Sequence, residues 1–531
     1  MMLRLKTWPW AAWSASTRLQ SIKHVHEVAF VSLLLAIYTS VTCAAGDFRN
    51  TSRKNVLYIV VDDLRPDLEP YGQGYVHTPN IAALANKSLI FDRAYCQFAF
   101  CAPSRSSFMT GRRPDRTECW NFVDNFRETV GQNWTTLPQY FKDNGYFSTG
   151  VGKLFHPLLP PNGDPPSWSD FRDFPYINPL YLDCPDFKSW CSLDRAEDAF
   201  ADGLTVNEAL RRMRYAVHNL SQPFFLGVGF HKPHLPFRAP DGFIELYPAA
   251  ENVTLARNKT WPRNAPTIAW NGCLASPGRY KDITERRDYL TPMSDDEAGY
   301  VRRGYYAAVS FTDSLIGQLM SELDALGVAN ETIISLHGDH GWHLGEHNMW
   351  CKMSNFELGV RVPWMVHVPD VERCSGTHTP ALAELVDVYP TLAELAGLPL
   401  PGDLDGTSQA PVFHADGVSV KNVSLSQFPK CGSNLTHMGT CEHRDKHLLD
   451  YMGYTIRTDQ YRYTEWFRWN GTELRADLSQ AVARELYDHH GDDGTDFDSF
   501  ENENVAAEQA SLADELSAEL HRVVTGQRRS F

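Results

Sequence analysis

The sequence has little positive charge, and this limits the kinds of partner it can bind. It contains 49 lysines and arginines against 65 aspartates and glutamates, so its formal net charge at pH 7 is −16. Because a nucleic-acid-binding surface needs an excess of basic residues, this balance argues against nucleic acid as a partner. If the substrate is an anion, the attraction must come from a local cluster of arginine, lysine and histidine.

Long apolar runs are also scarce. One run, VAFVSLLLAIY, begins at Val28, follows several basic residues and precedes a stretch of small ones. This pattern predicts a signal peptide over residues 1–45 and a mature protein that is lumenal, soluble and without a stable membrane span. The alternative is a signal anchor, since Val28 to Ala45 is about 18 residues long, roughly the shortest plausible membrane helix.

Sequons and cysteines agree with the secretory route. Ten N-x-S/T sequons favour a glycoprotein, and eleven cysteines suggest disulfide bonds. The pairs Cys184/Cys191 and Cys431/Cys441 are close enough in sequence to form short loops. Cys43 lies in the predicted signal peptide, and Cys101 is considered below. The remaining cysteines are Cys96, Cys119, Cys273, Cys351 and Cys374. Because their number is odd, at least one of them stays unpaired within the chain. The sequons are at Asn50, Asn86, Asn133, Asn219, Asn252, Asn258, Asn330, Asn422, Asn434 and Asn470.

The chain is long enough for two domains and shows no internal repeat. At 531 residues it exceeds the size at which one core usually stops growing. A connection rich in Pro, Gly and Asp at about 399–417 predicts a boundary between a larger domain, 46–405, and a smaller one, 406–531. The smaller part contains YTIRTDQYRYTEWF, which predicts a hairpin around a turn at 458–460. An amphipathic helix is predicted at about 505–524.

The stretch Cys101 to Arg113, CAPSRSSFMTGRR, predicts a tight loop that leads into a helix. Pro103 suits a first turn, the serines suit caps and Gly111 suits a helix end. A helix N-terminus gathers unpaired N–H groups and the positive end of the helix dipole, so an anion binds well there. Cys101 stands at that end with Arg105 one turn further on. The alternatives are a buried apolar thiol or half of a disulfide for Cys101, and a helix-surface ion pair for Arg105.

Polar residues follow four apolar strand patterns at the point where each ends. Continuous apolar runs are typical of strands buried on both faces of a parallel sheet. Since ligands bind at the carboxyl ends of such strands, we expect one pocket at one edge of one sheet. Taken singly, each polar residue has the alternative of an ordinary surface group. The residues that follow the runs near 55, 147, 224 and 332 are Asp62, Asp63, Lys153, His156, His231, Asp339, His340 and, further on, Lys352.

Helical spacing of apolar residues predicts the remaining elements of an α/β fold with helices flanking the sheet. Residues 157–203 and 236–292 have little periodicity, which predicts long irregular excursions. The predicted helices are at about 78–89, 137–144, 205–219, 307–326 and 379–397, the last kinked or divided at Pro390.

Three of these carboxylates predict a metal site. Asp62, Asp63 and Asp339 offer hard oxygen ligands, which suit Ca²⁺, Mg²⁺ or Mn²⁺ more than zinc. His340 as a fourth ligand is less usual for Ca²⁺ and, on ligand type alone, keeps Mn²⁺ open.

The string C-A-P-S-R followed by T-G-R resembles the signature of type I sulfatases, whose cysteine is oxidised in the endoplasmic reticulum to formylglycine. The resemblance implies the alkaline-phosphatase-like fold, a large mixed, mostly parallel sheet flanked by helices with a smaller C-terminal α+β domain that contains an antiparallel sheet. It implies a formylglycine-generating enzyme as a partner during maturation. It also implies one Ca²⁺ per chain, held by Asp62, Asp63, Cys101 as formylglycine, Asp339 and His340.

Longer strings, among them VGKLFHP, FHKPHLPFR and GDHGWHLGEH, are similar to one branch of that family. This branch removes the 2-O-sulfate of non-reducing-terminal iduronate in heparan and dermatan sulfate. The resemblance therefore implies fragments of sulfated glycosaminoglycans as substrates, and a lysosomal or secreted enzyme.

The family mechanism assigns a role to each catalytic candidate. The hydrated aldehyde at residue 101 attacks sulfur, and a sulfated enzyme results, which a second hydroxyl then resolves. From this we predict that Cys101→Ser traps the sulfated enzyme, because serine lacks that second hydroxyl. The implied roles are charge neutralisation for Arg105, Lys153 and Lys352, protonation of the leaving sugar oxygen for His231 with Lys352, and proton acceptance for His156.

Three alternatives stay open on the sequence. The first is a sulfatase for another sugar sulfate or an aryl sulfate. The second is a protein that binds sulfated glycans and keeps Cys101 unmodified. The third is a phosphatase or phosphodiesterase of the wider alkaline-phosphatase-like group, whose members use Ser or Thr as nucleophile.

Overall fold

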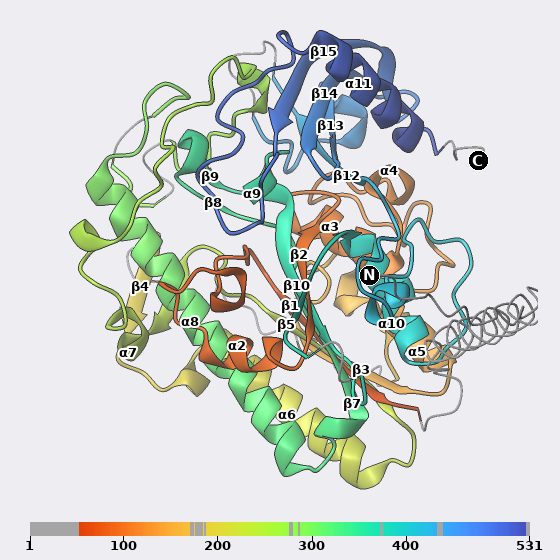
Figure 1. Ribbon diagram of the computed structural model, residues 1–531. Helices are drawn as coiled ribbons and strands as arrows, with labels where there is room; N and C mark the ends of the chain where they lie inside the picture. The colour runs from red at the N-terminus through yellow and green to blue at the C-terminus, as the bar shows by residue number, and fades with distance from the viewer. Residues whose placement is uncertain are drawn as a thin grey trace, which may run out of the picture. The chain divides into compact units, whose positions relative to one another are not determined.

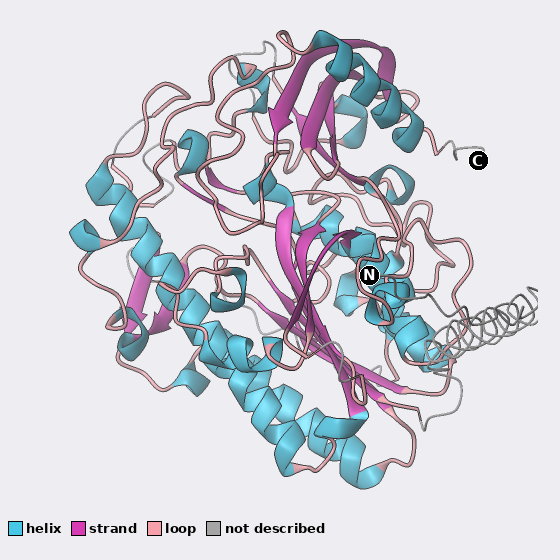
Figure 2. Ribbon diagram, viewed as in Figure 1, coloured by secondary structure: helices cyan, strands magenta, loops and turns pink. Residues whose placement is uncertain are grey.

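Seven strands form the main sheet of the computed structural model, which describes residues 53–169, 175, 184, 187–275, 280–284, 287–371, 375–432 and 439–526. The strand order is β11-β2-β10-β7-β1-β5-β3. Within this sheet β10 runs antiparallel to both of its neighbours and every other neighbouring pair is parallel, which confirms the predicted mostly parallel sheet. The bounds are β1 (Asn55–Val61), β2 (Leu89–Tyr95), β3 (Phe147–Gly152), β5 (Phe224–Phe230), β7 (Thr332–Gly338), β10 (Arg361–His367) and β11 (Thr377–Glu384), as Figures 1 and 2 show.

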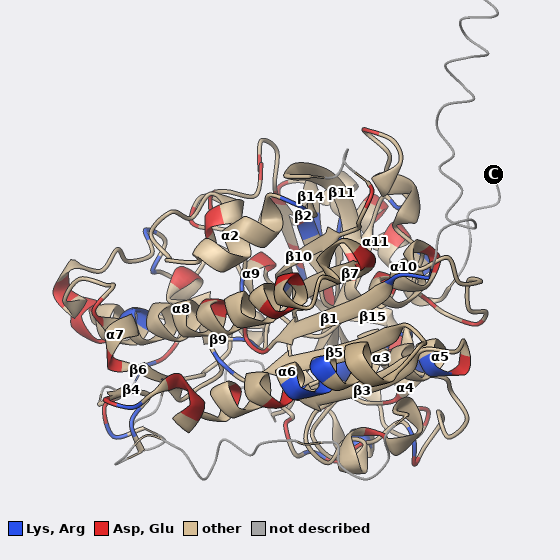
Figure 3. Cartoon of the chain, turned by 90° about the horizontal axis from the view of Figure 1, so that it is seen from below, with Lys and Arg blue, Asp and Glu red and all other residues tan. Residues whose placement is uncertain are grey.

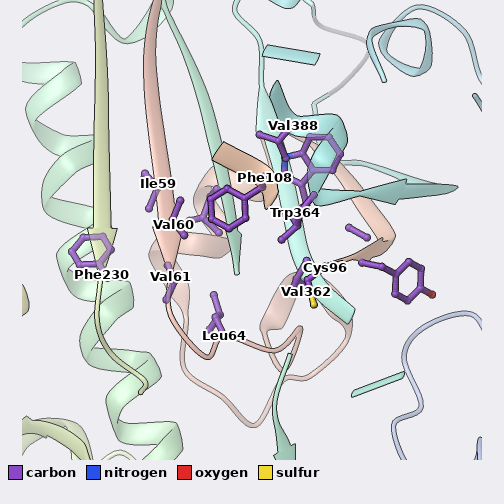
Figure 4. Close-up of a cluster of buried hydrophobic side chains, with 14 of the residues drawn as sticks. Ile59, Val60, Val61, Leu64, Cys96, Phe108, Phe230, Val362, Trp364 and Val388 are labelled. Carbon is purple, nitrogen blue, oxygen red and sulfur yellow. The ribbon is translucent and has the colours of Figure 1, made fainter. Parts of the chain in front are cut away.

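Helices cover both faces of this sheet (Figures 1 and 3). The core on one side of β1 and β10 contains Val60, Phe108, Trp364 and Val388, whereas Ile59 lies on the other side of β1 (Figure 4). These side chains are almost fully buried, so the strands are apolar on both faces, as the sequence predicts. One layer consists of α2 (Pro79–Ala85), α6 (Ala201–Asn219) and α8 (Asp295–Ala325), and the other of α3 (Cys101–Thr110), α5 (Leu137–Asp143) and α10 (Val388–Leu395).

A second, antiparallel sheet follows near the C-terminus. Its order is β12-β13-β14-β15, and the predicted hairpin is present as β13 and β14. Leu516 and Leu520 of α11 are buried. The boundary between residues 405 and 406 stays a prediction. The bounds are β12 (Ser424–Lys430), β13 (Tyr451–Arg457), β14 (Tyr461–Asn470), β15 (Arg475–Asp488) and α11 (Ala510–Val524).

Two predicted helices are wrong in part. The helix expected to reach residue 89 ends at Ala85, and Leu89 begins strand β2. Residues 379–384, expected to be helical, belong to β11, and the helix α10 begins at Val388. Pro380 fits this strand because β11 lies at the edge of the sheet, where a missing N–H is tolerated.

The long excursions contain some regular structure. A two-stranded parallel sheet pairs β4 (Trp190–Leu193) with β6 (Phe237–Pro240), and α7 (Asp241–Ile244) follows. The predicted helices at 205–219 and 307–326 both begin earlier than expected, at Ala201 and Asp295.

Disulfide bonds form between both predicted pairs, Cys184–Cys191 and Cys431–Cys441. A third joins Cys273 to Cys351. Among the described cysteines, Cys96, Cys101 and Cys119 are free thiols. Cys374, the sequons Asn50 and Asn434, and the predicted signal peptide lie outside the described residues. In the described ranges, no helix has the length and apolar character needed to cross a membrane.

Candidate active site

The strand register brings the predicted polar residues to one edge of the main sheet. Val61, the last residue of β1, pairs with Phe230 of β5 and with Gly338 of β7, so the residues that follow these strands are neighbours. Gly152 of β3 pairs with Gly229 of β5 in the same way. Gly229 must be glycine, because a Cβ there would lie 2.2 Å from the carbonyl carbon of Lys153. The ends of these strands therefore place four polar residues at the same edge of the sheet: Asp62, Lys153, His231 and Asp339.

Cys101 is the first residue of α3 rather than part of a preceding loop. The residue before it, Phe100, is extended and gives no side-chain cap, so the predicted serine caps are wrong. The serines lie within the helix instead, and Ser104 Oγ donates to the backbone oxygen of Asp339 at 2.5 Å. Gly111 ends the helix with a φ of 66°, as predicted.

Four side chains from separate segments converge on the sulfur of Cys101. Cys101 itself is buried. Its Sγ lies 3.1 Å from Lys352 Nζ, 3.2 Å from Asp62 Oδ1, 3.3 Å from His340 Nε2 and 3.7 Å from Lys153 Nζ. The predicted juxtaposition of these groups is therefore present.

Arg105 joins two of the carboxylates. It is fully buried, and its guanidinium lies 3.0 Å from Asp339 Oδ2 and 3.4 Å from Asp62 Oδ1. It also donates to the backbone oxygens of Lys153 and Leu154. The alternative of a helix-surface ion pair is thus wrong, since no part of this side chain reaches solvent.

The carboxylates Asp62, Asp63 and Asp339 are fully buried, yet their pKa values diverge. Burial raises the pKa of Asp62, but the positive charges around it, with Lys153 the largest, hold the pKa well below its ordinary value. Burial raises the pKa of Asp63 to about 6 in spite of its ion pair with Lys352. Burial and the neighbouring charge of Asp62 raise the pKa of Asp339 to about 8. An additional positive charge at this place would therefore stabilise the charged form of these carboxylates.

The donor set fits a hard cation. Asp63 Oδ2 is buried and has no hydrogen-bond partner among the residues that the structure describes, although a carboxylate oxygen in such a place normally has one. Ligand atoms of Asp62, Cys101, Asp339 and His340 lie within 4.8 Å of one another. The carboxylate oxygens are ligands that suit Ca²⁺, Mg²⁺ or Mn²⁺, and the imidazole of His340 is the less usual member of this set.

The two predicted acid–base histidines lie at the outer side of this cluster. His231 Nδ1 is 3.8 Å from Asp62 Oδ2, and the His231 side chain is 12% exposed. His156 stacks on Phe122 at a ring separation of 4.5 Å, and within the described residues no hydrogen bond joins it to Cys101. Burial and the charges of Lys153 and Arg105 lower the pKa of His156 to about 3. Burial also lowers the pKa of His231 well below its ordinary value.

His234 is a site residue that our sequence reasoning did not single out. It groups with Asp62, Asp63 and Cys101 as a possible ligand, and its ring centroid lies 4.7 Å from that of His231. Its Nδ1 contacts the backbone oxygen of Leu235 at 2.5 Å, which leaves Nε2 for the site. The signal was the second histidine of the string HKPH directly after β5.

Comparisons with known proteins show which family the chain is similar to. A family model described as Sulfatase matches residues 54–398. The chain is 35% identical to iduronate 2-sulfatase of Mus musculus, covering 87% of this chain and 93% of that protein. It is 36% identical to iduronate 2-sulfatase of Homo sapiens, covering 82% of this chain and 89% of that protein.

Solved structures share the fold. The phosphonate monoester hydrolase SpPMH from Silicibacter pomeroyi superposes with a TM-score of 0.68 at 19% identity, over 90% of this chain and 96% of that one. BT1596, a 2-O GAG sulfatase, superposes with a TM-score of 0.65 at 20% identity, over 89% of this chain and 92% of that one. At these identities the likeness concerns the fold alone.

Proposed function

The chain belongs to the sulfatase family and is a sulfuric ester hydrolase, and we propose that it hydrolyses the 2-O-sulfate ester of non-reducing-terminal iduronate in heparan and dermatan sulfate. The names of the mammalian relatives support this substrate. The family also favours a hydrolase over a glycan-binding protein with an unmodified Cys101.

The observation that carries the proposed reaction at residue 101 is the convergence of Lys352, Asp62, His340 and Lys153 on Cys101 Sγ. A formylglycine-generating enzyme converts Cys101, and formylglycine supplies, when hydrated, a nucleophile with two hydroxyl groups. The ammonium groups and carboxylate around Sγ are suited to orient such a group and to hold its protons.

One Ca²⁺ would be held by the side chains of Asp62, Asp63, Asp339, His340 and residue 101. When bound, the ion supplies a Lewis acid that offsets the negative charge of a sulfate ester. The unpaired Asp63 Oδ2 and the raised pKa values of Asp63 and Asp339 support a cation here.

The lysine and arginine side chains at the site neutralise the negative charge of the sulfate ester that the metal ion does not offset. Lys153 and Lys352 lie next to residue 101 and stabilise charge that develops on the sulfate oxygens. Arg105 holds Asp62 and Asp339 in place and adds a buried positive charge.

The histidines move the protons. His156 is neutral at acidic and neutral pH because burial and the charges of Lys153 and Arg105 lower its pKa to about 3. The negative charge of a bound sulfate ester raises this pKa, so the neutral ring can then accept a proton. His231 donates a proton to the departing sugar oxygen. Its pKa is low without substrate, but a bound sulfate ester brings negative charge that raises it, so protonation accompanies binding.

We further propose that the protein is a glycoprotein of the secretory pathway and acts in the lysosome or after secretion. The sequons Asn86, Asn133, Asn219 and Asn330 are exposed, as glycan acceptors must be.

The test is sulfate release by protein co-expressed with a formylglycine-generating enzyme. The substrates are short heparan and dermatan fragments that differ only in the position of the terminal sulfate. We expect release only from fragments that end in 2-O-sulfated iduronate. Release from another sugar alone would overturn the iduronate assignment and keep the sulfatase, whereas no release from any fragment or aryl sulfate would overturn the proposal.

A further inference from the structure

Lys352 lies in a loop whose backbone needs outside support. It follows the short hairpin of β8 (His343–Leu344) and β9 (Trp350–Cys351). The residues on either side of it, Cys351 and Met353, have φ values of 65° and 72°. Residues with side chains seldom adopt this left-handed conformation, and it persists only where surrounding contacts enforce it.

The segment 270–273 supplies those contacts. Cys273 forms a disulfide bond with Cys351, the residue before Lys352. Asn271 Nδ2 donates to the backbone oxygen of Lys352 at 2.8 Å, and Trp270 Nε1 donates to the backbone oxygen of Asn348 at 3.0 Å. One short segment thus contacts the hairpin at two points and Lys352, the residue after it, at a third.

Asn271 is itself held in place. Its Oδ1 accepts from the backbone N–H of Cys273 at 3.0 Å, and its side chain is almost fully buried. With one end bonded to its own segment and the other to Lys352, the amide has little freedom to rotate.

A second contact ties the segment to the loop. Lys430 of β12 is fully buried, and its Nζ donates to the backbone oxygens of Trp270 at 2.7 Å and of Met353 at 3.4 Å. The N–H of Met353 donates to the backbone oxygen of Ala99 at 3.1 Å, two residues before Cys101. The Lys352 loop is therefore fixed between the 270–273 segment and the chain that leads into α3.

We infer that the 270–273 segment, through Asn271 and the Cys273–Cys351 disulfide, positions the Lys352 ammonium against residue 101. Asn271, Cys273 and Lys430 are then positioning residues of the reaction, and they act through Lys352 rather than on the substrate. This inference rests on the proposed function, because it assigns the segment's purpose to the charge that Lys352 places 3.1 Å from Cys101 Sγ.

The first test compares two disulfides. The variant C273S/C351S removes the bond next to Lys352, and C184S/C191S removes a bond elsewhere as the matched control. Because a displacement of 1 Å in a catalytic group can cost about 100-fold in rate, we expect kcat of the first variant to fall about 100-fold while KM changes less than about threefold. The control should keep kcat within about threefold. Equal losses in the two variants, at a temperature where both are folded, would overturn the inference.

Asn271→Ala provides a test that leaves the disulfide in place. We expect kcat to fall about 10-fold, because one of the contacts that fix Lys352 is lost and the others remain. An unchanged kcat would overturn the role of Asn271.

A double-mutant cycle with Lys352→Met separates positioning from general stability. If Asn271 acts through Lys352, Asn271→Ala causes no further loss of kcat once Lys352 is Met. If the two losses multiply, Asn271 acts elsewhere and the inference fails. Failure of the proposed function would look different, since the unsubstituted enzyme would then release no sulfate from the fragment that ends in 2-O-sulfated iduronate.

Discussion

Replacing Lys352 by Met removes a buried positive charge with little change in side-chain volume. Lys352 Nζ contacts Cys101 Sγ at 3.1 Å, pairs with Asp63 and lies 5.5 Å from the centre of the Trp342 ring. The substitution therefore changes the charge next to residue 101 and leaves the packing against Trp342 largely intact.

The expected loss follows from the charge of the sulfate ester. Two opposite unit charges about 4 Å apart attract by about 4 kcal/mol at an effective dielectric constant of about 20. This energy corresponds to about 10³-fold in rate if it stabilises only the transition state. Part of the ammonium charge is engaged by the carboxylate of Asp63, so the effect on the substrate is smaller than this full attraction. We therefore expect kcat/KM to fall by about 10² to 10³.

The assay is sulfate release from the preferred fragment, with unfolding by urea measured in parallel. Lys352→Arg keeps the charge in a different shape and should lose less than Lys352→Met. Lys259→Met serves as control, because Lys259 forms an ion pair with Asp295 near the surface, 2.6 Å apart, where such pairs contribute little. If folded Lys352→Met protein kept more than about a tenth of the activity, the electrostatic reasoning would be refuted.

Three further predictions concern the nucleophile, the metal and the support of the site. Cys101→Ala and Cys101→Ser should both abolish multiple turnover while the protein stays folded, and repeated turnover by either would contradict a converted Cys101. Removal of the metal by a chelator should abolish sulfate release, and added Ca²⁺ should restore it. Asp63→Asn should raise the Ca²⁺ concentration that gives half-maximal activity at least about 10-fold, as titration of sulfate release with Ca²⁺ would show. Glu357→Gln should lower the free energy of unfolding by about 1–3 kcal/mol at neutral pH, because buried Arg457 and Arg462 each lose one charged partner and keep the other, Asp492 and Glu501 respectively. Burial raises the pKa of Glu357, but the two arginines hold it well below its ordinary 4.5. The difference in the free energy of unfolding between the variant and the unsubstituted protein should therefore be complete above pH 4.5 and shrink as the pH falls through the lower folded-state pKa of Glu357. If urea unfolding shows the same difference at every pH, the charged state assigned to Glu357 is wrong.

The convergence of the polar residues could be predicted because they follow strands with local, continuous apolar patterns. NVLYIVV could be identified as a buried strand without any partner, and Asp62 stands directly after it. Parallel strands then place their carboxyl ends at the same edge, so Lys153, His231 and Asp339 needed no long-range information to be grouped. This is also why the fold class was confirmed.

Local sequence patterns do not predict contacts between segments that lie far apart in the chain. The apolar spacing after Ala381 suits a helix as well as a strand, and the partner of β11, β2, lies far away in sequence, so local patterns predict a helix where β11 forms. The Cys273–Cys351 bond spans 78 residues, so its pairing depends on the folded chain. His234 was missed because two histidines in one short string give no indication of which side chain turns toward the carboxylates.

The most direct test of the account is the dependence of sulfate release on the chemical state of residue 101. Preparations that differ in the fraction of formylglycine, set by the amount of co-expressed generating enzyme and measured by mass spectrometry of the peptide that contains residue 101, would be assayed on the fragment with terminal 2-O-sulfated iduronate. We expect the rate to rise in proportion to the formylglycine fraction and to extrapolate to zero when Cys101 is unmodified. A rate that is independent of this fraction would contradict the account, because the nucleophile would then lie elsewhere.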